Sequence, residues 1–201
     1  MSTSPPETTY HHGDLKRALL ETALDMLDAE GAASIGLREV ARRVGVSAAA
    51  PYRHFASRQA LLEAVATEGF RRFGEMMAAK REDFAEAEQL PAMAEAYVRF
   101  ALVQPALFRL MFSRDIDKAD NRALHAAAAE AYGSLARAAA REDPGAPSET
   151  AVIAWAFVHG LSVLLLDDQI LMVRPEDSDG LVRRLAQRFV AGLRAAVARG
   201  A

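Results

Sequence analysis

Cysteine is absent from this chain of 201 residues. Its absence excludes a disulfide scaffold, a thiolate zinc site and a cysteine nucleophile, and it agrees with a reducing cytoplasm. The longest apolar run, residues 151–166, is shorter than the roughly 18–20 residues that cross a membrane. No apolar segment of a signal peptide follows the polar residues 1–10. We therefore expect a cytoplasmic protein that begins with a disordered arm.

The signatures of common enzyme classes are missing too. The chain has no glycine-rich phosphate loop, no G-x-S-x-G motif and no H-E-x-x-H motif. His11 and His12 stand side by side, but no third metal ligand lies at a useful spacing. The sequence therefore predicts no enzyme, no metal site and no cofactor. An enzyme built on a helical bundle is kept as an alternative.

Alanine is abundant, with 43 of the 201 residues. It is the best helix former and a poor strand former, and no stretch shows sustained β-branched alternation. The sequence therefore predicts an all-α fold, with Asp14, Ser47, Ser57 and Ser148 as N-caps. Helices are expected at residues 15–29, 37–44, 48–55, 58–80, 90–103, 105–111, 119–141, 149–168 and 177–199.

Residues 37–58 read LREVARRVGVSAAAPYRHFASR and carry the functional signal. Two short helices flank a turn at Gly45, which is the spacing of a helix-turn-helix, whose second helix enters the major groove of DNA. Residues 38–58 hold five arginines and one acid, a local charge of +4 in a chain whose net charge is −3. Such a basic island attracts phosphate, while Tyr52 and His54 add neutral donors. The sequence therefore predicts a DNA-binding surface here.

Residues 11–73 resemble the N-terminal DNA-binding domain of TetR-type transcriptional regulators. The likeness rests on the segments LREVA (37–41), GVS (45–47), YRHF (52–55) and SR (57–58), followed by two leucines at 61–62. It implies an all-α homodimer that binds operator DNA and is usually a repressor released by a small ligand. It further implies that Phe55 closes the three-helix core. The implied phosphate contacts are Ser47, Tyr52, His54 and Arg58, and the implied base-edge contacts are Ala48 and Ala49.

This segment departs from the family pattern at two places, and its recognition face is unusual. Gly36 stands where the family usually has a Ser or Thr cap, and Pro51 lies inside the expected recognition helix. The recognition face is a run of alanines, which can touch a thymine methyl group but make no bidentate hydrogen bond to a base. We therefore expect specificity to depend on Arg38, Arg53 and DNA shape.

The expected helix 149–168 is apolar on nearly every side. A helix of this kind must be buried all round, and a second subunit is the simplest way to cover it in so short a chain. Together with the last helix it predicts a four-helix dimer interface. Trp155, His159 and Gly160 resemble the Trp…His-Gly signature of one C-terminal subgroup of the family. The expected interface residues are Val152, Phe157, Leu164, Val182, Phe189 and Leu193.

The C-terminal part is also where an effector would bind. Ligand cavities are lined by bulky apolar side chains with a few polar groups. The candidates here are Tyr97, Phe100, Phe108, Met111, Phe112, His125, Tyr132, Trp155 and His159.

The chain thus divides into an arm (1–10), a helix-turn-helix DNA-binding domain (11–57), a connecting helix (58–82) and a helical bundle for ligand binding and dimerisation (83–201). We predict a homodimeric transcriptional regulator, a repressor released from double-stranded operator DNA by a small apolar or aromatic effector. The alternatives are a regulator that answers to a protein partner or to nothing at all.

Overall fold

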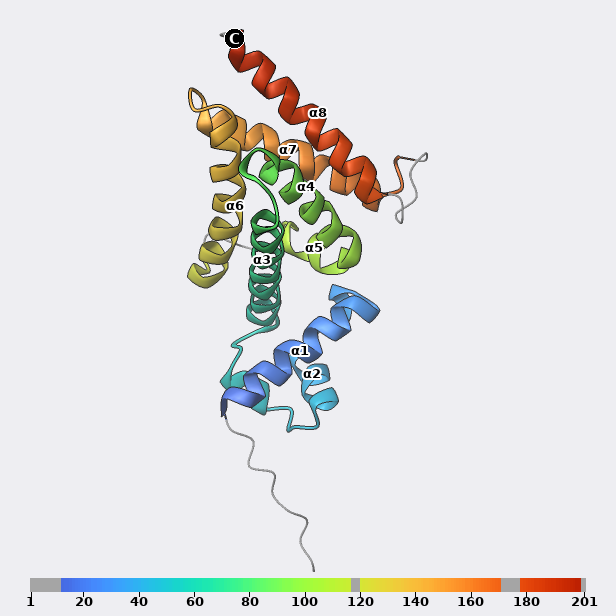
Figure 1. Ribbon diagram of the computed structural model, residues 1–201. Coiled ribbons are helices and arrows are strands. Elements are labelled where there is room, and N and C mark those ends of the chain that lie inside the picture. The colour runs from blue at the N-terminus through green and yellow to red at the C-terminus, as the bar shows by residue number, and fades with distance from the viewer. Residues whose placement is uncertain (1–11, 117–119, 171–177, 200–201) are drawn as a thin grey trace, which may run out of the picture. The chain divides into compact units, whose positions relative to one another are not determined.

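The computed structural model describes residues 12–116, 120–170 and 178–199, and the expected arm at 1–10 lies outside them. Within these residues the chain is helical and has no strand, so the all-α prediction is confirmed. The chain forms two compact units, the first ending at Val65 and the second beginning at Ala66. The α-helices are α1 His12–Glu30, α2 Leu37–Val44, α3 Arg58–Glu82, α4 Glu86–Val103, α5 Pro105–Met111, α6 Arg122–Glu142, α7 Pro147–Leu166 and α8 Ser178–Ala198 (Figure 1).

The first unit is a small three-helix core. Leu19, Ala23 and Leu27 of α1 recur at helical spacing and are all buried, and Val40 of α2 and Phe55 are buried with them. α1 ends as expected, with Gly31 just beyond it at φ 82°. α1 begins at His12, however, so the predicted N-cap at residue 14 is wrong, because that residue is already inside the helix.

The expected recognition helix at 48–55 is not an α-helix. Only a short 3-10 turn, Ala50–Arg53, forms there. Pro51 has no N–H to donate to the Ser47 carbonyl, which accepts instead from Ala50 N–H at 3.0 Å in the tighter i to i−3 pattern. The residue before the turn is Ala49, and no side chain caps it. The prediction that Ser47 caps an α-helix here is therefore wrong.

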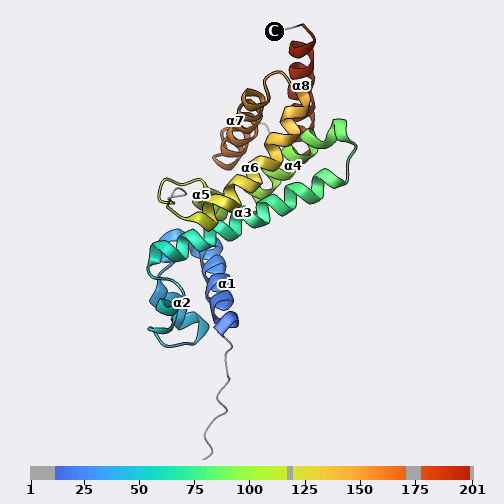
Figure 2. The same ribbon diagram turned by 90° about the vertical axis from the view of Figure 1, so that its left-hand side faces the viewer.

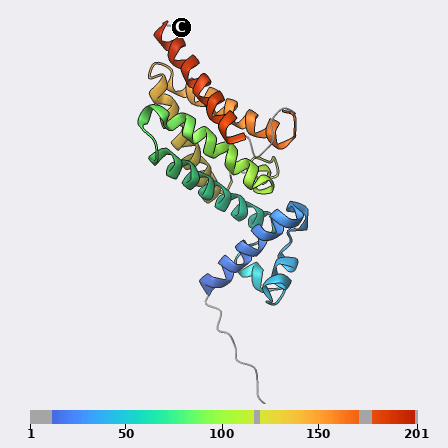
Figure 3. The ribbon, with the colours of Figure 1, turned by 45° about the vertical axis from the view of Figure 1, so that its right-hand side comes forward.

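The second unit is a bundle in which α4 is central. Its residues Leu90, Met93, Tyr97 and Phe100 are buried, and α4 packs against α7 and α8. Figure 3 shows α4 and α8 running side by side, and Figure 2 shows α6 beside α3 and α4.

Polar side chains order the segments before two helices of this bundle, and one of them is a cap. Asn121 Oδ1 accepts from Leu124 N–H at 3.1 Å and begins α6. α7 begins at Pro147, so the predicted cap at Ser148 is wrong. The carboxylate of Asp143 orders this loop instead, accepting from the N–H groups of Gly145 and Ala146 at 3.1 and 3.2 Å.

α7 is apolar, but its own protomer covers only one side of it. Ala154 and Val158 are buried, whereas Val152 and Leu164 are 54% and 46% exposed. The all-round burial expected from the sequence is therefore not met within one protomer. By length and composition α7 could also cross a membrane, contrary to the estimate from residues 151–166. The packing of α7 against α4 and α6 explains its apolar side as that of a bundle helix.

Candidate nucleic-acid interface and internal cavity

The backbone around the helix-turn-helix is held by a few specific contacts. Gly45 ends α2 at φ 81°, a left-handed conformation that suits glycine. Ser57 Oγ accepts from Ala60 N–H at 3.1 Å and caps α3, as predicted. The Arg58 guanidinium donates to the carbonyls of Ile35 and Ala32 at 2.7 and 2.6 Å. Arg58, a predicted phosphate contact, thus also holds the segment that leads into α2.

The other predicted contact residues are mostly exposed. Tyr52 is 51% exposed, and Ser47, Ala48, Ala49, Arg38 and Arg53 are exposed as well. His54 differs, because its ring is half-buried and its Nε2 is a buried atom with no hydrogen-bond partner in the described part of the chain. Its phosphate contact would have to use the other ring nitrogen.

The basic island at residues 38–58 offers less positive charge to a ligand than its five arginines suggest. Glu39 accepts from Arg42 at 2.7 and 2.9 Å and from Arg43 at 2.9 Å, and Arg43 also pairs with Glu30 at 2.7 Å. Hydrogen bonds from Arg42 and then Arg43 lower the pKa of Glu39 to about 2. Two of the five arginines are therefore committed to carboxylates.

Arg38 and Arg53 are different. Neither makes a hydrogen bond or ion pair with any residue in the described ranges 12–116, 120–170 and 178–199. Their guanidinium groups are therefore the arginines of the island best placed to meet phosphate or a base edge.

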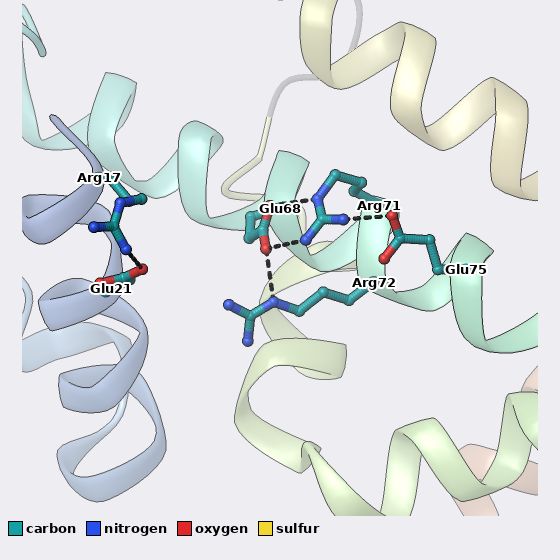
Figure 4. A network of polar contacts seen from close by, with 6 residues as sticks. All are labelled: Arg17, Glu21, Glu68, Arg71, Arg72 and Glu75. Carbon is teal, nitrogen blue, oxygen red and sulfur yellow. Dashed lines mark hydrogen bonds and ion pairs between the residues drawn. The ribbon is translucent and has the colours of Figure 1, made fainter. Parts of the chain in front are cut away.

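Other arginines are committed to neighbours on their own helix (Figure 4). On α3, Glu68 accepts from Arg71 at 2.6 Å and from Arg72 at 2.7 Å, and Arg71 also pairs with Glu75. Hydrogen bonding by Arg71 lowers the pKa of Glu68. Such i,i+3 and i,i+4 pairs support the helix by a few tenths of a kcal/mol each and leave little net charge. This part of α3 is therefore not a second basic patch.

The second unit contains a cavity of about 400 Å³ that is partly open to solvent. Among the nine candidates, Tyr97, Phe112, His125, Tyr132 and Trp155 line it. The other four do not: Phe100, Phe108 and Met111 lie in the packed core, and His159 lies behind Tyr97.

Sequence reasoning missed the wall that α3 supplies. Phe70, Phe73 and Met77 line the cavity at helical spacing. The sequence gives no sign of this, because a stripe of apolar residues facing a cavity has the same periodicity as one facing a filled core. The wall of α6 is lined by small residues, Ala128, Ala129 and Ala131, which leave the space open.

One polar network faces this cavity. Tyr97 Oη accepts from Trp155 Nε1–H at 3.2 Å and lies 2.9 Å from His159 Nδ1. Burial raises the pKa of the Tyr97 hydroxyl, and burial lowers the pKa of the His159 imidazole. Both groups are therefore neutral near pH 7.

The predicted interface residues on α7 and α8 divide into two groups. Val152 and Leu164 are exposed, and Phe157 stacks on Phe189 with ring centroids 4.7 Å apart. Phe189 and Leu193 are half-buried. Val182 is 1% exposed and belongs to the core of its own protomer, so it is not available to a partner.

Comparisons with known proteins agree with this architecture. Residues 19–65 match the family model for bacterial regulatory proteins of the tetR family, and residues 90–189 match that for the tetracyclin repressor-like C-terminal domain. The chain belongs to the TetR family. It is therefore a DNA-binding transcriptional regulator with a helix-turn-helix. The C-terminal match does not assign the Trp…His-Gly subgroup, which stays a prediction.

Solved structures show the same fold. A protein of unknown function from Rhodococcus sp. RHA1 is 33% identical with a TM-score of 0.81, and the alignment covers 92% of this chain and 98% of that one. BioQ from Mycobacterium smegmatis is 25% identical with a TM-score of 0.60, covering 92% and 99%. A tetR family transcription regulator from Shewanella sp. PV-4 is 18% identical with a TM-score of 0.66, covering 87% and 95%. No curated protein matches the chain.

Proposed function

We propose that this TetR-family regulator is a cytoplasmic repressor that binds operator DNA as a homodimer and is released by a small apolar or aromatic effector. The observation that carries the proposal is the largely apolar cavity of about 400 Å³ in the unit that follows the DNA-binding one. A volume of this size lies within the range of small-molecule sites.

On the DNA side, the exposed residues divide by chemistry. Ser47, Tyr52, His54 and Arg58 would hold the phosphates, which fixes the position of the protein on the duplex. Ala48 and Ala49 would lie against base edges, where a methyl group can meet only the methyl of thymine. Arg38 and Arg53, which have no partner among the described residues, supply the charged donors.

Two glycines support a homodimer through α7 and α8. A Cβ built at Gly160 or Gly192 would meet no atom of the described residues within 4 Å beyond its own stretch of helix. Glycine inside a helix costs about 1 kcal/mol relative to alanine, and no close packing against a described residue compensates for it at these positions. Close approach of a second copy against the exposed Val152 and Leu164 accounts for both glycines.

Release of DNA would be a shift between two populations of the dimer. α3 supplies Arg58 and Leu61 to the first unit and Phe70 and Phe73 to the cavity wall. A ligand that binds one arrangement of α3 more tightly shifts the equilibrium by its difference in affinity between the two arrangements.

A reporter assay tests the proposal. The DNA upstream of the gene for this protein is placed before a reporter, and the protein is supplied from a second plasmid. We expect reporter output to fall, and the fall to be lost in an Arg38→Ala, Arg53→Ala double variant that is produced at the same level. An increase in output on adding the protein would show an activator, and an unchanged output with confirmed DNA binding would exclude repression at this site.

A further inference from the structure

The walls of the cavity define the charge of what it can hold. Phe70, Phe73, Phe112 and Trp155 supply aromatic surface, and no Lys, Arg, Asp or Glu is among the described residues that line it. His125 is the lining histidine, and it is exposed to solvent. A carboxylate or phosphate placed among the aromatic side chains would lose its hydration with no lysine or arginine of the described lining to compensate. The occupant is therefore uncharged.

Tyr97 is among the residues that line this cavity, and the hydrogen bonds of its hydroxyl can be assigned. Tyr97 as a whole is only 1% exposed. An indole nitrogen can only donate, so the contact with Trp155 at 3.2 Å makes Tyr97 Oη an acceptor. The hydroxyl hydrogen must then go elsewhere.

His159 Nδ1, 2.9 Å away, is the atom that can take this hydrogen. If Nδ1 carried the proton, Tyr97 would accept from both neighbours and its own hydrogen would have no acceptor among the described residues, which is unfavourable in so buried a residue. A neutral His159 with its proton on Nε2 satisfies every group. Tyr97 then donates to His159, accepts from Trp155, and keeps one acceptor position on Oη.

We infer that the effector is an uncharged, mostly apolar molecule with a hydroxyl or amide N–H group that donates a hydrogen bond to Tyr97 Oη. The inference rests on the proposed function in taking the cavity as the effector site. It adds that the polar group of the effector is a hydrogen-bond donor. Apolar ethers and esters of the same shape, which only accept, would meet a lone pair and bind more weakly. Tyr97 is thereby a specificity-determining residue.

Three saturated probes with one skeleton test this inference: cyclohexylcyclohexanol, its methyl ether and the matching cyclohexylcyclohexane carboxylate. None of them absorbs light where indole does. Trp155 is the only tryptophan of the sequence and lines the cavity, so its fluorescence reports binding to the full-length protein. We expect the alcohol to bind about tenfold more tightly than the ether, and the carboxylate to bind at least tenfold more weakly than the alcohol. An ether or a carboxylate that binds as tightly as the alcohol overturns the inference, as does the absence of binding by all three.

Two variants locate the hydrogen bond. In Tyr97→Phe, checked for folding by circular dichroism, the alcohol should bind only as tightly as the ether. In Tyr132→Phe, which removes the other tyrosine hydroxyl of the cavity, the preference for the alcohol should remain. If the preference is lost in Tyr132→Phe instead, Tyr97 is not the partner and the inference is wrong. If Tyr97→Phe fails to fold, the inference is still tested by comparing alcohol and ether binding in the wild type and in Tyr132→Phe.

The probe measurements need no DNA, so their outcome is separate from that of the proposed function. DNA binding and repression by the wild-type protein without a preference for the alcohol would overturn only the inference about the effector. A clear preference for the alcohol in a protein that does not repress would leave the cavity chemistry intact and overturn the proposed function.

Discussion

The guanidinium of Arg58 donates to the carbonyl oxygen of Ile35 at 2.7 Å, across 23 residues of sequence. A second bond from the same side chain reaches Ala32 at 2.6 Å. The first residue of α3 thereby holds the segment that precedes α2. Within the described part of the chain, both N–H groups of Nη1 and the second N–H of Nη2 make no hydrogen bond, so a phosphate contact would use these donors.

This relationship predicts that Arg58→Ala destabilises the protein as well as weakening DNA binding. Loss of two charge-assisted hydrogen bonds to backbone carbonyls, made by an exposed side chain, should lower the free energy of unfolding by about 1–2 kcal/mol. Thermal unfolding followed by circular dichroism measures this. The control is Arg53→Ala, which should keep the wild-type Tm and still lose DNA affinity. A wild-type Tm for Arg58→Ala would show that these bonds contribute nothing.

Removing the charge of Glu39 should strengthen DNA binding. In Glu39→Gln, Arg42 and Arg43 lose the carboxylate that both now share, so more positive charge is available to phosphates. We expect affinity to rise several-fold and the slope of log affinity against log salt to steepen by about 1. Fluorescence anisotropy of labelled DNA over a salt series measures both. An unchanged slope would mean that these arginines do not approach phosphate.

Gly69 and Gly74, both on α3, differ in the space around them and so allow a matched test of how an added methyl group changes stability. A Cβ at Gly69 would lie 2.7 Å from Met111 Sδ and 2.9 Å from Leu107 Cδ1, whereas one at Gly74 would lie at an ordinary 3.8 Å from Ala131. Met111 and Leu107 are both buried, so they must repack to make room.

Gly69→Ala should therefore lower the free energy of unfolding by about 1–2 kcal/mol, because the clash exceeds the gain in helix propensity. Gly74→Ala should raise it by up to about 1 kcal/mol. Denaturant unfolding of the two variants compares them directly. Equal stability changes would contradict the close contact at Gly69.

A large side chain at Gly160 should separate the dimer without unfolding the protomer. The part of the protomer that the structure describes has room there, since no atom beyond the same stretch of helix lies within 4 Å of an added Cβ. Light scattering should give the dimer mass for the wild type and about half of it for Gly160→Leu at the same concentration. The control is Ala126→Leu, an equal enlargement at an exposed position of α6, which should stay dimeric. A Gly160→Leu variant that remains a dimer would place the interface elsewhere.

Glycine and proline residues at helix ends made parts of this fold predictable from the sequence. α2 and α5 occupy the residues expected of them, because Gly45 and Pro105 mark their ends in the chain itself. The recognition segment was predicted wrongly, because one proline decided between an α-helix and a 3-10 turn.

The cavity was harder to predict from the sequence. Its aromatic residues could be named, but Tyr97 lies 58 residues from Trp155 and 62 from His159, and no local pattern shows that they meet. The open space itself depends on small residues of α6 facing large ones of α3. Composition alone does not reveal such an arrangement.

Selection of binding sites from a library of random duplex DNA tests the central claim most directly. The purified protein is mixed with the library, bound DNA is recovered over several rounds, and the recovered DNA is sequenced. We predict enrichment of one two-fold symmetric site whose half-sites lie about one helical turn or a multiple of it apart, as two recognition segments of a homodimer require. Failure to enrich any sequence above the starting library, with protein that is folded and dimeric, would contradict the account.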